Sequence, residues 1–193
     1  MESIQLSALT ELDAVNRIIG TIGESPIDTL DDMTDVDAIN AYRILLDISR
    51  QEQSRGWSFN RISHFKLTPD MYTKKIPWNS NILFLKANHH VHKLIRQGNY
   101  VKDLRRDSVI FEHPIDVEIV FYIPFDELPE QMRNYIISKA CFIFQQNYFG
   151  DESLVKTTQM QMQEAWQLLQ EFEIDNNNYS MFDHTYVRKL LMR

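Results

Sequence analysis

Residues 50–60 read Arg50-Gln-Glu-Gln-Ser-Arg-Gly-Trp-Ser-Phe-Asn60, and this stretch decides the fold. A helical pattern of apolar residues stops at Gly56, and an aromatic, alternating pattern begins at Trp57 with no linker between them. Glycine often follows a helix because the left-handed conformation costs it no Cβ clash. In an extended strand, Trp57 and Phe59 would lie on one face. We therefore predict a direct helix-to-strand junction.

The segment before the junction begins with a predicted helix. Ser7 or Thr10 can cap it, and Thr10 has capping-box spacing to Asp13. Gly23 is expected to end this helix. Its apolar residues recur at three- and four-residue steps, which predicts one buried stripe of Leu12, Val15, Ile19 and Ile22.

An acidic connector, Glu24–Asp37, leads to a second predicted helix and is followed by no basic residue before Arg43. Asp35 or Asp37 is expected to cap this helix, because a carboxylate is favourable at the positive end of the helix dipole. The predicted buried stripe consists of Ala38, Ala41, Tyr42, Leu45 and Ile48.

The middle of the chain has the short alternating runs that are typical of strands. Gln97-Gly-Asn99 between two runs predicts a hairpin turn. The candidate strands are 57–67, 82–87, 91–96, 100–104, 109–112 and 117–123.

Two further helices are predicted after Pro124. One begins near Pro129 and ends at Gly150, and the next begins at Asp151 or Ser153. The run Asp175-Asn-Asn-Asn178 is expected to end the last helix. Its predicted apolar stripe is Leu154, Thr158, Met162, Ala165, Leu169 and Phe172.

These elements predict an α+β protein. Two N-terminal and two C-terminal helices, 1–56 and 124–178, would form a four-helix bundle, because amphipathic helices must bury their stripes against one another. Residues 57–123 would form a β-rich lobe, and 179–193 an extended C-terminal docking tail.

Composition limits the classes of function. The net charge of −7 makes tight binding of nucleic acid improbable, because basic side chains supply most of that affinity. The single Cys141 excludes an intrachain disulfide. We expect no membrane span, since no apolar run approaches the ~20 residues that are needed. The start of the chain does not resemble a signal peptide, so synthesis and folding in a cytoplasm are expected.

Candidate catalytic and metal-binding residues are few. His90 and His92 would share a face of a strand and could begin a zinc site, but an exposed polar turn explains them more simply. Acid pairs for glycoside hydrolysis can be proposed, among them Glu11/Asp13, Asp31/Asp32 and Glu171/Glu173. Helix caps and solvated ends explain such acids equally well. We expect no catalytic residue, metal or cofactor.

The junction at 50–60, together with Ala14-Val-Asn16, Ile22-Gly-Glu-Ser-Pro26, Thr29-Leu30 and Phe149-Gly150, resembles the tail tubular protein A family of T7-like podoviruses. The similarity is strongest over 14–30, 50–60 and 128–150, and it is loose over 71–111. The matching motifs are structural rather than catalytic.

The resemblance implies a structural protein of the virion tail, an adaptor ring of about twelve copies that joins the portal to the tail nozzle, tail tubular protein B. A tail fibre is a further candidate partner. Genomic DNA would pass through the ring without sequence-specific binding, past an acidic channel surface that repels it. The candidate channel-facing acids are Asp28, Asp31, Asp32 and Asp35.

The C-terminal tail is strongly apolar for a chain end, which indicates that it docks on a protein surface. That surface could be a partner or the chain's own bundle. The candidate interface residues are Tyr179, Phe182, Tyr186, Arg188, Leu190 and Leu191. Two alternative functions stay open: a tail-associated glycan hydrolase acting on host surface polysaccharide, and a prophage remnant with no current role.

Overall fold

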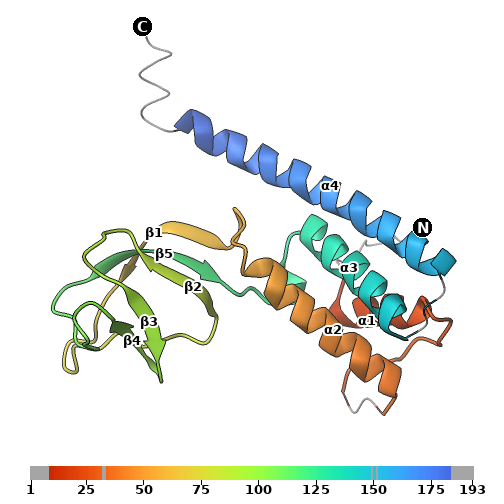
Figure 1. The fold of residues 1–193 in the computed structure, drawn as a ribbon, viewed down its shortest axis with the longest axis horizontal. Coiled ribbons are helices and arrows are strands. Elements are labelled where there is room, and N and C mark those ends of the chain that lie inside the picture. Colours follow the sequence, from red (N-terminus) through yellow and green to blue (C-terminus); the bar gives the residue numbers. More distant parts are fainter. Residues whose placement is uncertain (1–8, 32–33, 149, 151, 184–193) are drawn as a thin grey trace, which may run out of the picture. The chain divides into compact units, whose positions relative to one another are not determined.

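The computed structural model describes residues 9–31, 34–148, 150 and 152–183. The chain divides into two compact units, which Figure 1 draws together and which are treated separately here. The helical unit consists of the chain up to Glu52 and from Pro124 onward, and the β unit is Gln53–Ile123. The predicted lobe began at 57, so the β unit starts four residues earlier, within the last turn of the second helix.

The helical unit contains α1 (Glu11–Gly20), α2 (Val36–Gln53), the short 3-10 helix η1 (Phe125–Glu127), α3 (Glu130–Tyr148) and α4 (Glu152–Asp183). The predicted capping box is confirmed: Thr10 Oγ1 accepts a hydrogen bond from the Asp13 N–H, and Asp13 accepts one from the Thr10 N–H. Asp35 caps α2 by accepting from the N–H groups of Asp37 and Ala38.

The core of the helical unit is built around α3, which contacts α1 on one side and runs beside α4 on another (Figure 1). Much of α3 is therefore buried, including Met132, Ile136, Ile137 and Phe144, which are fully buried. The buried side chains of α2 include Ala38, Ala41, Leu45 and Ile48, as predicted. The description as a four-helix bundle stays a prediction.

The β unit contains β1 (Arg61–Leu67), β2 (Ile82–Ala87), β3 (Leu94–Gln97), β4 (Tyr100–Asp103) and β5 (Ile115–Phe121). β5 is the central strand of an antiparallel sheet in the order β1-β5-β2, and β3 and β4 form a separate hairpin. The predicted hairpin turn is confirmed, with Gly98 at φ +59°. Side chains from both sheets share one hydrophobic core, which includes Ile76, Val101, Phe111, Val117 and Ile119.

The junction differs from the prediction. β1 begins at Arg61, and Trp57–Asn60 forms a turn in which the N–H groups of Asn60 and Arg61 both donate to the Trp57 carbonyl. Asn60 holds this turn, because its Oδ1 accepts from the Trp57 N–H at 2.7 Å while its amide donates to the carbonyls of Gln53 and Phe121. The hydrogen bonds of this buried asparagine thus hold residues 57–60 in a turn, where the sequence predicts the start of the strand.

Four more boundaries need correction. β3 starts at Leu94 rather than 91, since 88–91 form bends and turns. The predicted strand at 109–112 makes only one isolated bridge, between Ile110 and Lys75. β5 covers Ile115–Phe121 instead of 117–123. The first helix ends at Gly20, three residues before Gly23.

The largest correction concerns α4, which continues through the Asn176–Asn178 run to Asp183. Asparagine favours helix ends, because its side chain can hydrogen-bond to nearby backbone groups there. In a helix interior its propensity is only slightly below that of other residues, so a long helix can continue through an asparagine run. Residues 179–183 of the predicted extended tail are therefore helical, and 184–193 lie outside the described residues. Among the helices described, none is long and apolar enough to cross a membrane.

Candidate functional site

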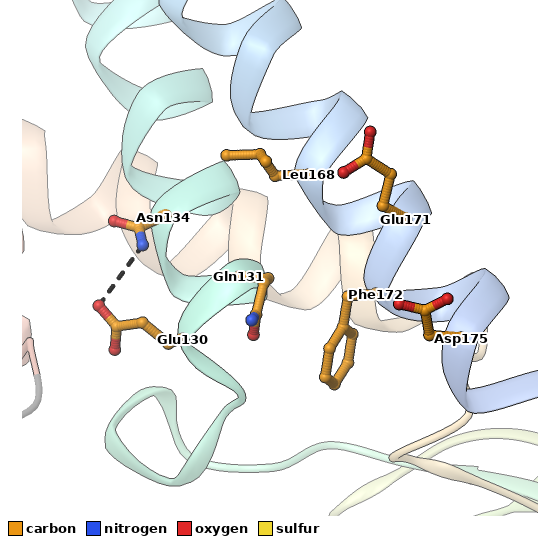
Figure 2. A pocket seen from close by; sticks show the side chains of 7 residues that line it. All are labelled: Glu130, Gln131, Asn134, Leu168, Glu171, Phe172 and Asp175. Carbon is orange, nitrogen blue, oxygen red and sulfur yellow. Dashed lines mark hydrogen bonds between the residues drawn. The ribbon is translucent and has the colours of Figure 1, made fainter.

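A groove lies between α3 and α4 in the helical unit (Figure 2). It encloses about 400 Å³. The α3 side supplies polar side chains, and the α4 side supplies both apolar and acidic ones (Figure 2). The lining residues are Glu130, Gln131, Asn134, Leu168, Glu171, Phe172 and Asp175.

The groove exists because α4 buries only a narrow stripe. Thr158, Ala165 and Leu169 of the predicted stripe are buried, at steps of seven and four residues, which place them on one face of the helix. Leu154, which the prediction placed in the same stripe, is exposed. Leu168 is 53% exposed and lies one position before the buried Leu169, so the apolar surface of α4 extends past its contact with α3.

The acidic side chains of the groove differ between its two sides: the one on α3 is paired, and the two on α4 are not paired with any described residue. Glu130 is paired with Arg133, whose Nη2 lies 2.7 Å from Oε2. Asn134 also donates to the Glu130 carboxylate. Glu171 and Asp175 have no hydrogen-bond or ion-pair partner among the described residues, and they lie four positions apart on α4, where like charges repel. The groove thus combines an apolar floor with two unneutralised carboxylates.

The β unit has a second, smaller pocket of opposite charge, enclosing about 190 Å³. Basic side chains dominate it, over an apolar base of Leu85, Ala87 and Leu94. Its basic lining consists of Lys86, His90, His92, Lys93 and Arg105.

Asp103 organises the loop beside this pocket, and sequence reasoning missed that role. Its side chain is 1% exposed and lies 2.7 Å from His92 Nδ1. It also accepts hydrogen bonds from the backbone N–H groups of Lys93 and Arg105. Burial raises the pKa of this carboxyl, but the hydrogen bonds outweigh burial, so the pKa lies below its usual value. The one sign of this role in the sequence is that Asp103 interrupts the basic run Lys102-Asp-Leu-Arg-Arg106.

The histidine run forms a turn, as the simpler interpretation predicts. His89 and His90 are exposed, and His92 Nδ1 lies within hydrogen-bond distance of Asp103. The described residues contain no group of three or more His, Cys, Asp or Glu side chains that could hold a metal ion.

One of the candidate acid pairs, Glu11 and Asp13, has a structural role. Glu11 accepts a hydrogen bond from the Tyr42 hydroxyl, and Asp13 belongs to the capping box. The hydrogen bonds from Thr10 hold the pKa of Asp13 below its usual value. Asp32 lies outside the described residues, and Glu171 lines the groove.

The predicted interface and channel residues are only partly described. Asp28, Asp31 and Asp35 are exposed, and Asp35 also caps α2. Tyr179 and Phe182 belong to the last turns of α4. The remaining residues, Tyr186, Arg188, Leu190 and Leu191, lie outside the described part of the chain, and so does Asp32.

Comparison with known proteins identifies the family. The family model for tail tubular proteins matches residues 12–179, which include both units. The chain belongs to the tail tubular protein family. It is also similar to tail tubular protein A of Klebsiella phage KP34, with 27% identity over 148 residues that cover 75% of this chain and 76% of that protein.

Family membership confirms the resemblance stated from the sequence motifs. Tail tubular proteins are structural components of the virion, so this chain is a structural protein of a phage tail and assembles there with other tail proteins. The comparisons give no support to the glycan hydrolase alternative.

Proposed function

We propose that this protein forms an adaptor ring of about twelve copies that joins the portal to the tail nozzle, tail tubular protein B, and lines the channel for the genome. The observation that carries the proposal is the family match over residues 12–179. A structural role needs complementary surfaces and no turnover. The two oppositely charged hollows, the α3–α4 groove and the basic pocket of the β unit, are suited to protein contacts.

Ring formation is tested by measuring mass with light scattering, for the protein alone and mixed with portal protein. We expect a complex of the portal with about twelve copies of this chain, because closed cyclic symmetry leaves no unpaired interface. A strict monomer in the presence of the portal would refute the ring. A monomer without the portal agrees with assembly that the portal nucleates.

The channel surface is the second part of the proposal. We assign Asp28, Asp31, Asp32 and Asp35 to it, because carboxylates repel phosphates and allow DNA to move. The variant Asp28→Lys/Asp31→Lys/Asp32→Lys spares Asp35, whose side chain caps α2. Phages carrying this variant should assemble normally and eject their genome more slowly, with the greatest delay at low salt.

The matched control reverses three exposed acids elsewhere in the helical unit, Glu127, Glu152 and Glu164. This control has the same change in charge and should eject DNA at the wild-type rate. Equal ejection rates for the channel variant and wild type at all salt concentrations would remove these acids from the channel surface.

A further inference from the structure

The α3–α4 groove has the shape and charge of a docking site for a short segment that is both apolar and basic. Leu168 and Phe172 supply an apolar floor, and Glu171 and Asp175 supply carboxylates without a partner among the described residues (Figure 2). A like-charge pair at this helical spacing destabilises α4 unless a cation is placed beside it. A cation supplied by a bound segment would relieve this repulsion.

One segment of the chain has the complementary composition. Residues 184–193 read His-Thr-Tyr-Val-Arg-Lys-Leu-Leu-Met-Arg, in which Arg188 and Lys189 directly precede Leu190 and Leu191. Two cations beside two leucines match two carboxylates beside two apolar side chains. The segment carries no acidic residue, so it would meet no repulsion in the groove.

The geometry disfavours docking of this segment on its own α4. Leu168 lies about 22 Å before the end of α4 at Asp183, at a rise of about 1.5 Å per residue. The residues from His184 to Leu190 span at most about 25 Å when fully extended. Almost nothing remains for reversing the chain, and 184–193 contain no Gly, Pro, Asn, Asp or Ser to favour a sharp turn.

We propose that residues 184–193 of one copy dock in the α3–α4 groove of a neighbouring copy, with Arg188 and Lys189 beside Glu171 and Asp175. Leu190 and Leu191 then cover Leu168 and Phe172. This inference rests on the proposed ring and names one contact between its copies. A closed ring gives every groove one segment and every segment one groove, because each heterologous interface repeats around the axis.

The test joins the two surfaces covalently in the full chain, within complexes assembled on the portal. Two differently tagged forms are produced together, one carrying Gln131→Cys and the other Leu190→Cys; a second pair uses Asn134→Cys and Leu191→Cys. The native Cys141 is retained because its thiol is buried. Mild oxidation should give a covalent dimer that contains both tags.

Charge reversal makes the test specific. Glu171→Lys/Asp175→Lys in the first form should reduce the dimer at least tenfold, and Arg188→Glu/Lys189→Glu in the second form should restore it. The control Glu152→Lys/Glu164→Lys places the same charges elsewhere on α4 and should leave the yield unchanged. This control separates a local contact from a general effect of charge.

Four results would overturn the inference. Assembled rings without a covalent dimer from either pair would refute the contact and leave the ring itself intact. If a further form that carries both Gln131→Cys and Leu190→Cys is crosslinked only within its own chain, and the two tagged forms never crosslink, the segment lies on its own helix. A dimer that persists undiminished after charge reversal would refute the recognition by charge. If unsubstituted chains form no ring with the portal, the proposed function fails, and this inference fails with it.

Discussion

The side-chain amide of Gln53 pairs with the backbone of Ile123 through two hydrogen bonds. Gln53 Nε2 donates to the Ile123 carbonyl at 2.9 Å, and the Ile123 N–H donates to Gln53 Oε1 at 2.8 Å. These residues are the first and last of the β unit. Gln53 is fully buried, so the pair closes the unit where the chain enters and leaves it.

Gln53→Ala should lower the free energy of unfolding by about 1–3 kcal/mol, because it removes the partners of the partly buried N–H and carbonyl of Ile123. Urea titration followed by tryptophan fluorescence measures the change. The control Gln51→Ala alters an exposed residue of the same helix and should cost less than about 0.5 kcal/mol. Equal stability of the two variants would contradict the structural role of the pair.

Gly56 and Gly98 allow a matched test of the junction. Both have positive φ, +75° and +59°. A Cβ at Gly56 would lie 2.6 Å from the Arg61 guanidinium and 2.9 Å from Val120 Cγ2, whereas a Cβ at Gly98 meets nothing within 4 Å. Gly98→Ala should therefore cost only the backbone strain, about 1 kcal/mol.

Gly56→Ala should cost about 1–3 kcal/mol more than Gly98→Ala, because a displaced Val120 side chain in the packed sheet adds to the same backbone strain. Thermal unfolding of both variants gives the comparison. An equal loss at the two positions would mean that the close approach of β5 to Gly56 is not a constraint.

Asp103 should make the stability of the β unit sensitive to acid. Its pKa is lowered from 3.8 in the folded state, since hydrogen bonds from His92 and two backbone N–H groups outweigh burial. A lowered pKa stabilises the folded state above the unfolded value, and this contribution is lost as the pH falls through the folded value. Asp103→Asn should therefore be less stable than wild type at neutral pH.

The difference between wild type and Asp103→Asn should shrink as the pH falls from about 5 to about 2. Urea unfolding at several pH values measures it, and the exposed Asp28→Asn serves as a control that changes one charge without a buried network. A difference that stays constant over this range would show that the carboxylate of Asp103 contributes nothing through its charge.

Cys141 should be unreactive in the folded protein. Burial raises the pKa of its thiol to about 11, and the side chain lies in α3. At about pH 8 only about one molecule in a thousand would carry the reactive thiolate, even before access is considered. Labelling with a thiol reagent should accelerate more than about a hundredfold in denaturant. Fast labelling of the native protein would place the thiol at the surface.

Amphipathic patterns predicted the helices well because burial follows the helical period. The buried stripe of α2 and the cap at Thr10 required only local sequence. The stripe of α1 was predicted only in part: Val15 and Ile19 are buried, but Ala14 and Ile18 are buried in place of Leu12 and Ile22. β2 was predicted with its observed bounds, since alternating runs between turn residues are also local signals.

The errors came from interactions between distant residues. Asn60 converts the expected start of β1 into a turn through contacts with Gln53 and Phe121, and no local pattern reveals them. The Asn176–Asn178 run signals a helix end only by weak preferences, which a long helix can override. The groove depends on how α4 lies against α3, so its lining residues could not be grouped from sequence alone.

The two-bond closure at Gln53 and Ile123 has an evolutionary consequence. The β unit is an insertion whose ends are held by its own residues, Gln53, Asn60, Phe121 and Ile123. Recombination between related phages could therefore exchange residues 53–123 as one continuous segment, without a change in the remaining sequence of the helices that flank it.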